Sequence, residues 1–265
     1  MDLPFDPTFS VGPFRIAWHS FWALVGLGIG SWLSFRLARH LVRDERIYPF
    51  AIAVVLGGLV AARAGHIADN WPYYSSRPDQ LAAFWNGGVA VAAAPIGSAI
   101  GGFIAARRLR LPLGFMFDVT VIGIILGEAI GRIGDIINGE HHAVACAGLS
   151  WCIRYTDPAT LGQRDFVHPV VAYDLIVDVL IFIVLLWCWR RVRGHPPEGR
   201  VFLLYVVLYG GFRFATSFLR LDPVVLASLQ EAQLLGLGYV VVGVPALVLF
   251  HRRGLAARST TTTIT

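Results

Sequence analysis

Ionisable side chains occur inside segments of this sequence that are otherwise strongly apolar. Glu128, Arg132 and Asp135 lie in one such segment, and their spacing of four and three residues places them on one face of a helix. Charged groups inside an apolar span are costly, so they are candidates for function by default. The structural alternative is an ion pair between Arg132 and either acid that only fixes helix packing.

Composition sets the environment in which this face must work. The chain has 265 residues, of which 56% are hydrophobic and only 15% are charged, and its mean hydropathy is +0.63. A soluble domain usually carries about 25% charged residues, so a soluble single domain is excluded, as are disordered and collagen-like chains. The net charge of +5 does not indicate a nucleic-acid partner, because basic cytoplasmic loops account for it in a membrane protein.

Seven apolar segments are long enough to cross a bilayer, which takes about 20 helical residues. They predict an all-α polytopic membrane protein that forms a single transmembrane domain over residues 1–265, with a small external head at 139–169 and a frayed tail at 259–265. The predicted spans are 16–35, 48–67, 87–106, 113–138, 170–189, 201–219 and 234–251.

Arginine positions predict the orientation of the spans. All 22 basic residues are arginine, and 14 of them lie in the loops after the first, third and fifth spans and in the C-terminal tail. Only five lie in the connections on the other side. The positive-inside rule therefore puts the N-terminus outside and the C-terminus in the cytoplasm, which requires an odd number of spans.

With this orientation, ionisable residues from four spans fall at the outer ends of their helices. Several arginines at one depth need an anion, and guanidinium groups bind phosphate oxygens with two parallel hydrogen bonds. In an outer leaflet the available phosphate is a phospholipid headgroup. No charge ring, filter loop or pair of related halves indicates a channel or a transporter. The residues concerned are Arg63, His66, Arg132, Asp135, Asn138, His168, Tyr173, Asp174, Arg213 and Arg220.

Small and sulfur-containing residues support packing more than chemistry. Gly123, Gly127 and Gly131 form a ridge that predicts close helix packing. Cys146 and Cys152 lie in the external segment, where a disulfide and two free thiols are both consistent with the sequence. No cysteine or histidine spacing indicates a metal site, and no cofactor is expected.

The ten residues 131–140 read G-R-I-G-D-I-I-N-G-E. This stretch resembles the signature of the prolipoprotein diacylglyceryl transferases, roughly G-R-x-G-N-x-x-N-G-E. The similarity extends over nearly the whole chain, because other segments agree in order and spacing. They are 9–18 at the start of the first span, 62–65, 85–88, the acidic Asp118, 168–174, and 209–220.

The resemblance implies transfer of a diacylglyceryl group from phosphatidylglycerol to the lipobox cysteine in the signal peptide of a preprolipoprotein. A thioether forms and glycerol phosphate leaves, in a bacterial plasma (inner) membrane with the active site toward the outer leaflet. Arg132 and Arg213 would clamp the lipid phosphate, with Arg63 and Arg220 secondary. Asn138, Gly139 and Glu140 would shape the headgroup site, and His168 and Tyr173 would support it. The implied catalytic set is Arg132, Asp135, Glu140 and Arg213.

Four positions depart from the family pattern. Ala92 stands where the family has a histidine in the third span, Asp135 replaces an asparagine, His19 a tyrosine and Ser217 a glutamate. A thiol must lose its proton to become a nucleophile, and here Asp135, Glu128, His19 or water could accept it. Asp135 could instead only orient Arg132. Two further functions stay open: a related enzyme with another acceptor, and a non-catalytic phospholipid-binding or transport protein.

Overall fold

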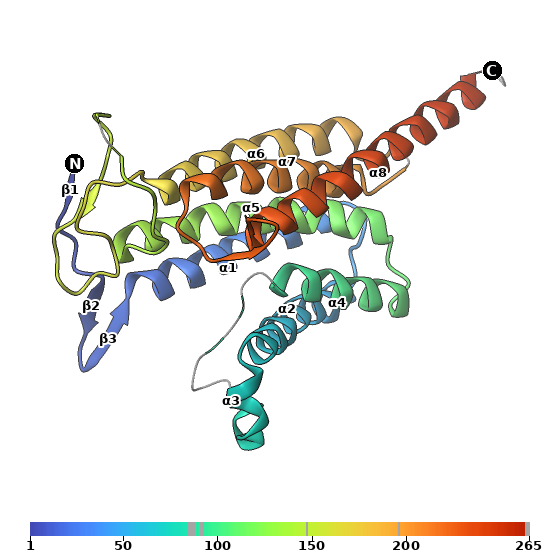
Figure 1. Ribbon diagram of the computed structural model, residues 1–265. Coiled ribbons are helices and arrows are strands. Elements are labelled where there is room, and N and C mark those ends of the chain that lie inside the picture. The colour runs from blue at the N-terminus through green and yellow to red at the C-terminus, as the bar shows by residue number, and fades with distance from the viewer. Residues whose placement is uncertain (84–87, 89, 91–92, 147, 196, 263–265) are drawn as a thin grey trace. The chain divides into compact units, whose positions relative to one another are not determined.

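The computed structural model describes residues 1–83, 88, 90, 93–146, 148–195 and 197–262 (Figure 1). The chain forms two compact units, which are described separately. The first comprises Met1–Leu37 and Asp118–Thr265, and the second comprises Ala38–Phe117. Ala92, where the family histidine is missing, lies outside the described residues.

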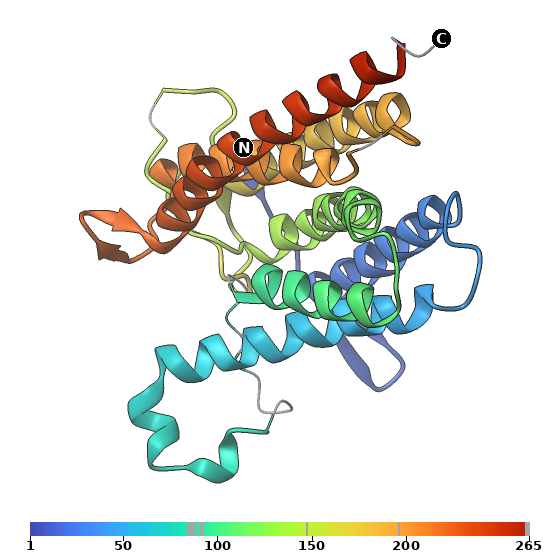
Figure 2. The same ribbon diagram turned by 90° about the vertical axis from the view of Figure 1, so that its right-hand side faces the viewer.

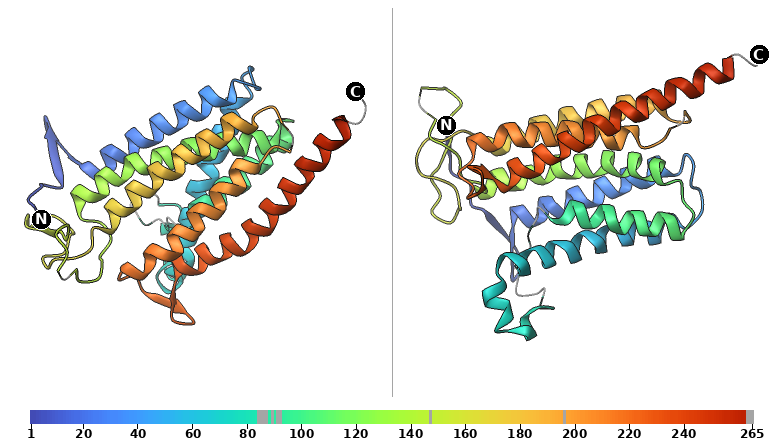
Figure 3. Two further views of the ribbon diagram at one scale, coloured as in Figure 1. Left: turned by 90° about the horizontal axis from the view of Figure 1, so that it is seen from above. Right: turned by 45° about the vertical axis from the view of Figure 1, so that its right-hand side comes forward.

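Five helices build the first unit. They are α1 (Trp18–Ala38), α5 (Leu113–Asn138), which begins in the second unit, α6 (Val170–Val192), α7 (Arg200–Thr216) and α8 (Glu231–Thr262). Helix α7 packs against both α6 and α8, and the views in Figure 3 show the three side by side. Long apolar runs favour helices here because a helix satisfies its own backbone hydrogen bonds within the membrane.

Glycines let α1 and α5 approach closely in antiparallel directions. A side chain at Gly26 would collide with the carbonyl of Gly127, and one at Gly30 with the carbonyl of Gly123. The packing ridge predicted on α5 is therefore confirmed at Gly123 and Gly127. It is wrong at Gly131, where a Cβ would meet nothing within 4 Å. The close contact with α1 continues at Gly134 instead, where a Cβ would collide with His19 and Trp18.

The second unit is built around a pair of helices, α2 (Ile47–Asp69) and α4 (Ala94–Arg108). The short helices α3 (Trp71–Ser75) and η1 (Pro78–Gln80) follow α2, as the view in Figure 2 shows. Gly57 of α2 lies against Gly97 and Gly101 of α4 so closely that a Cβ on any of them would meet backbone. Small residues at a helix–helix contact are typical of membrane proteins.

Six helices of the described residues are long and apolar enough to cross a membrane, so the protein is a multi-pass membrane protein. They correspond to six of the seven predicted spans, and the span predicted at 113–138 agrees with α5 at both ends. The third predicted span, 87–106, is represented by α4, which has 15 described residues. The seventh crossing and the orientation of the termini stay predictions. The backbone of α8 continues to Thr262, and the expected fraying of 259–265 is untested.

The described residues are mainly helical, as the all-α prediction requires, and a few short strands accompany the helices. Strands β2 (Thr8–Val11) and β3 (Phe14–Ala17) form a hairpin that leads into α1. Strand β1 (Asp2–Leu3) pairs in parallel with β4 (Arg154–Tyr155). Strands β5 (Val224–Leu226) and β6 (Leu229–Gln230) follow the 3-10 helix η4 (Ser217–Leu219).

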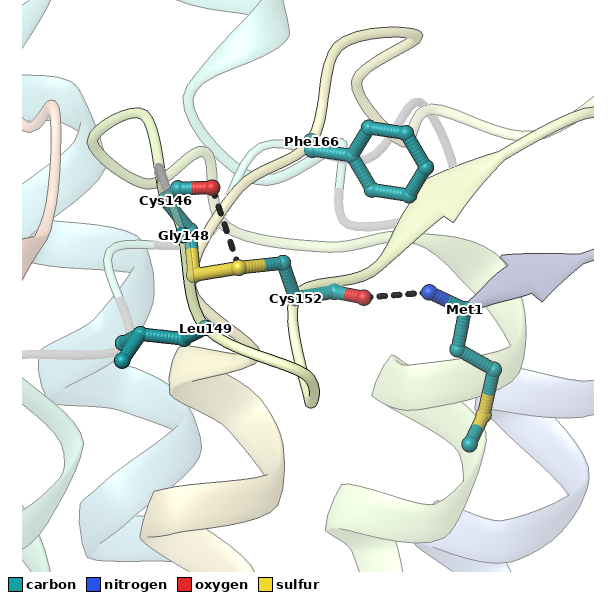
Figure 4. Close-up of a pocket in the computed structure, with 6 residues that line it drawn as sticks. All are labelled: Met1, Cys146, Gly148, Leu149, Cys152 and Phe166. Atoms are coloured by element: carbon teal, nitrogen blue, oxygen red, sulfur yellow. Dashed lines mark hydrogen bonds between the residues drawn. A yellow bond between two sulfur atoms is a disulfide. The ribbon is translucent and has the colours of Figure 1, made fainter.

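The segment between α5 and α6, which was predicted to form a small head, contains a disulfide. Cys146 and Cys152 are bonded, which decides between the two alternatives left open by the sequence. The disulfide lines a hollow of about 370 Å³ together with Leu149 and Phe166, and the amino group of Met1 donates to the carbonyl of Cys152 at 2.5 Å (Figure 4). The side chains that line this hollow are mainly apolar, and the amino group of Met1 is already bonded to a carbonyl.

Candidate active site

Helix α5 carries the centre of the site. Arg132 donates from Nη2 to Oε1 of Glu128 at 2.6 Å and from Nη1 to Oδ2 of Asp135 at 3.2 Å. The prediction that these three residues share one helical face is therefore confirmed. The side chain of Arg132 is only 12% exposed, so its charge lies inside the protein and is held in place by both acids.

Three arginines converge on one carboxylate of α6. The Oδ2 atom of Asp174 lies 3.9 Å from Nε of Arg132 and 3.5 Å from Nη1 of Arg213, and it accepts a short hydrogen bond from Arg220. Asp178, one turn further along α6, lies 3.7 Å from Nε of Arg132. We call Arg132, Arg213 and Arg220 the arginine cluster. Their helices are α5 and α7, with Arg220 just beyond η4.

The arginine cluster retains unused hydrogen-bonding capacity. Among the described residues, buried Nε of Arg132 and both Nε and Nη1 of Arg220 have no hydrogen-bond partner. A buried N–H without a partner costs roughly 1–3 kcal/mol, so these donors need an acceptor. A phosphate supplies several acceptor oxygens in the geometry that guanidinium groups match. The cluster therefore has the chemistry of an oxyanion site.

Helix α7 supplies a second contact to the acids of α5. The hydroxyl of Tyr209 donates to Oε1 of Glu128 at 2.8 Å, and Arg213 follows four residues later on the same face. Ser217, where the family has a glutamate, is fully buried and donates to the carbonyl of Arg213 at 2.7 Å. The hydroxyl of Ser217 therefore bonds the backbone of α7 rather than a side chain of the site.

The end of α5 is shaped by a glycine. Gly139 has a φ of +77°, and a Cβ there would collide with the backbone of Gly162 in the head. Beside it, Nδ2 of Asn138 donates to Oε1 of Glu140 at 2.5 Å. The structure thus brings Asn138 and Glu140 together. Position 139 requires glycine because its φ is positive and a Cβ would not fit.

The two supporting residues predicted at the start of α6 contact each other. Nδ1 of His168 lies 3.3 Å from the hydroxyl of Tyr173, and Nε1 of Trp151 donates to that hydroxyl at 2.9 Å. Trp151 belongs to the head, so these contacts join the head to α6. Their predicted role in lipid binding stays a prediction.

Arg63 lies in the second unit and is fully engaged there. Its guanidinium donates to the carbonyls of Gln80, Leu81 and Gly88 at 2.6–3.1 Å, and it lies over the ring of Tyr74. These partners are backbone groups of the segment after α3, so they support a structural role. The phosphate contact implied by the resemblance stays a prediction.

Asp118, for which the sequence suggested no role, caps α7. Its Oδ2 accepts from the amide of Gly199 and its Oδ1 from the amide of Phe202, each at 2.8 Å. The first amides of a helix have no partner within the helix, and a buried acid from α5 provides one here. This capping could not be foreseen from sequence because the two segments are 81 residues apart.

One contributor to the site, Asp178, and one contact, that of His19, were not predicted from the sequence. Asp178 is buried beside Arg132, and its position one turn after Asp174 in an apolar span was the available signal. His19 was considered only as a proton acceptor, yet its Nδ1 lies 2.6 Å from Oδ1 of Asp135. That contact joins α1 to the face of α5 that carries Arg132.

Comparison with known sequences places this arrangement in a family. A family profile described as "Prolipoprotein diacylglyceryl transferase" matches residues 7–249. The chain belongs to this family. A phosphatidylglycerol–prolipoprotein diacylglyceryl transferase of Dehalococcoides mccartyi is 33% identical over 247 residues, which cover 92% of this chain and 93% of the relative.

Two further members of the prolipoprotein diacylglyceryl transferase family, which have the same name, show similar agreement. The relative from Thermosynechococcus vestitus is 32% identical over 251 residues, 93% of each chain. The relative from Clostridioides difficile is 32% identical over 239 residues, 90% of this chain and 92% of its own. Membership identifies the protein as a membrane transferase of lipoprotein biosynthesis, as the sequence motifs predicted.

Proposed function

We propose that this protein transfers the diacylglyceryl group of phosphatidylglycerol to the lipobox cysteine of a preprolipoprotein and releases glycerol phosphate. The observation that carries the proposal is the arginine cluster, in which buried Nε of Arg132 and Nε and Nη1 of Arg220 lack hydrogen-bond partners among the described residues. The names of the relatives give phosphatidylglycerol and prolipoprotein as the substrates of those proteins.

The arginine cluster would act on the group that leaves. The thiolate attacks the glyceryl carbon, the carbon–oxygen bond breaks, and the electron pair stays on the phosphate. Preorganised positive charge stabilises this developing anion, and one such donor is typically worth 10²–10³ in rate. Arg132 and Arg213 would grip the phosphate, while Arg220 would be its third contact. Asp174 holds the three guanidinium groups together before the lipid arrives.

The polar residues at the end of α5 would face the lipid headgroup. Asn138 and Glu140 form a hydrogen-bonded pair, and both side chains can bond the hydroxyls of the terminal glycerol. Asp135 lies between Arg132 and His19, so we assign it to orienting its neighbours rather than to accepting the thiol proton itself. A carboxylate held by two partners is a weak base.

The proposed location is a bacterial inner membrane with the arginine cluster toward the outer leaflet. The support is the distribution of arginines along the sequence, of which 14 fall on the predicted cytoplasmic side. The residues of the arginine cluster and its acids lie near the ends of helices: the last turns of α5 and α7 and the first turns of α6. A headgroup at the membrane surface reaches such a level without crossing the apolar core.

The test uses purified protein with phosphatidylglycerol and a synthetic lipobox peptide. The expected result is a peptide whose mass has increased by one diacylglyceryl group, together with free glycerol phosphate. The same peptide with serine in place of the cysteine should stay unmodified, and phosphatidylcholine should not replace the donor. Binding of phosphatidylglycerol is measured in parallel.

The outcomes separate the functions left open by the sequence. Lipid binding without modification of the cysteine peptide would contradict the proposed reaction. Release of glycerol phosphate in that case would indicate a different acceptor. If no glycerol phosphate were released, a phospholipid-binding or transport protein would remain.

A further inference from the structure

An imidazole from α1 meets the face of α5 that carries the arginine cluster. His19 lies in the first turn of α1, and its Nδ1 is 2.6 Å from Oδ1 of Asp135. The other oxygen of Asp135 accepts from Arg132 at 3.2 Å. One carboxylate therefore connects the imidazole to an arginine that would hold the phosphate.

The backbone makes room for this contact. A Cβ on Gly134 would lie 2.7 Å from Cα of His19 and 2.8 Å from the carbonyl oxygen of Trp18. Both distances are too short for a real side chain, so glycine at this position is what lets the first turn of α1 touch α5. The contact between His19 and Asp135 is therefore built into the packing of the two helices.

The carboxylate fixes which nitrogen of His19 can accept a proton. Nδ1 beside an ionised carboxylate acts as a donor, so the neutral ring carries its proton there and has its lone pair on Nε2. The side chain of His19 is 47% exposed, whereas that of Asp135 is 10% exposed. The ring thus keeps an accessible edge while its inner nitrogen is held. A base oriented by a third group is the usual arrangement for activating a nucleophile.

Other candidate bases near the arginine cluster are less suited. Oε1 of Glu128 already accepts hydrogen bonds from Arg132 and Tyr209. His141, just beyond α5, has an exposed surface, but desolvation of the ring lowers its pKa to about 3, and the positive charges of neighbouring arginines act in the same direction. A group with such a low pKa takes up a proton poorly at neutral pH.

We propose that His19, oriented by Asp135, is the general base that removes the proton from the lipobox cysteine. This inference rests on the proposed function. The thiol proton moves to Nε2 of His19 as the sulfur attacks the glyceryl carbon. The carbon–sulfur bond forms, the carbon–oxygen bond breaks, and its electron pair leaves with glycerol phosphate. The imidazolium then releases its proton to that phosphate or to water, which restores the neutral base.

The reaction should depend on pH through this step. A protonated His19 has no lone pair, so the rate should fall as the solution becomes acidic. The charged groups that act on the ring are Asp135 and Arg132 from α5 and Glu140 just beyond it. Asp135 and Arg132 form an ion pair, so protonation of Asp135 would also affect the ring. The fall in rate at acidic pH is therefore assigned to His19 by comparing variants, not from the pH profile of the unmodified protein alone.

The experiment compares His19→Asn and His19→Gln with the unmodified protein. The amide of Asn can replace Nδ1 in the contact to Asp135, yet it cannot accept a proton. Thioether formation is followed with two lipobox peptides, one with cysteine and one with selenocysteine, because a selenol is already ionised at neutral pH. Binding of phosphatidylglycerol is measured for each protein. The control is His251→Asn, at an exposed histidine of α8.

The expected loss for His19→Asn with the cysteine peptide is about 10²–10⁴-fold in rate, the range typical of a general base. Lipid binding should change little, the acidic limb should disappear, and the selenocysteine peptide should restore most of the rate. His251→Asn should match the unmodified protein. A merely structural role for His19 predicts equal losses with both peptides, and that result would overturn the proposal.

Two further results would also overturn it. One is full activity of His19→Asn with the cysteine peptide. The other is the same pattern of loss and selenocysteine rescue in His141→Asn instead. Failure of the proposed function is recognised separately, because the unmodified protein would then form no thioether with either peptide. In that case the assignment of His19 falls with the reaction on which it rests.

Discussion

Replacing Arg213 with glutamine should remove phosphate binding while leaving the fold intact. Arg213 is the least tightly bound member of the arginine cluster, since its Nη1 lies 3.5 Å from Oδ2 of Asp174 and its side chain is 21% exposed. Arg220 is fully buried against the same acid. A variant of Arg220 would leave a buried carboxylate short of a partner, which typically costs 3–5 kcal/mol of stability. A substitution of Arg213 therefore tests phosphate binding with less disturbance of the fold than a substitution of Arg220.

The size of the effect follows from these contacts. Truncating one partner of a buried, hydrogen-bonded charge pair typically costs about 2–5 kcal/mol of binding. At about 1.4 kcal/mol for each factor of ten, this corresponds to a loss of roughly 30-fold to 4,000-fold in kcat/KM. The free energy of unfolding should change less than in an Arg220 variant, because Asp174 keeps its hydrogen bond to the fully buried Arg220.

The assay measures thioether formation and phosphatidylglycerol binding for Arg213→Gln beside a matched control. Arg154→Gln removes an equally long cation that is paired with Asp2 at the surface, where the two side chains are 42% and 51% exposed. The control should keep its activity. If Arg213→Gln also kept kcat/KM within threefold, the arginine cluster would be a structural ion-pair network and the phosphate assignment would be refuted.

Three other expectations concern structure and orientation. Asp118→Ala should lower the free energy of unfolding by about 1–2 kcal/mol, because the two amides that it caps lose their acceptor. Thermal denaturation in detergent measures this change, and an unchanged midpoint would contradict the capping role. Arg63→Ala should make the segment after α3 more sensitive to protease, because the Arg63 guanidinium bonds backbone carbonyls of that segment. Phosphatidylglycerol binding should persist, and its loss in a stable protein would instead show a lipid contact. A cysteine introduced at Asp157 should be labelled from outside intact cells and one at Arg191 should not, and reversed labelling would refute the predicted orientation.

Much of the helical framework could be predicted from the sequence because the membrane leaves few choices. An apolar run of about 20 residues must satisfy its backbone internally, so it forms a helix. The span at 113–138 was therefore predicted at both ends. The short strands were not predicted, since a pair such as β1 and β4 joins residues about 150 positions apart. Local patterns carry no signal for such a distant pairing.

The arginine cluster was predictable in its members but not in its organisation. Charges in apolar spans are rare, so Arg132 and Arg213 were evident from the sequence. That both of them, with Arg220, converge on a single oxygen of Asp174 follows from how α5, α6 and α7 pack. Side-chain convergence depends on helix rotation and depth, and spacing along the chain constrains each helix only by itself.

Two departures from the family pattern meet in one hydrogen bond. His19 stands where the pattern has a tyrosine and Asp135 where it has an asparagine, and the structure joins their side chains at 2.6 Å. The imidazole gains a charged acceptor in Asp135, and the carboxylate beside Arg132 gains a second partner in His19. Together they supply a held, accessible base next to the arginine cluster. The sequence showed both residues but not their contact, which is why the pair could be argued only from the structure.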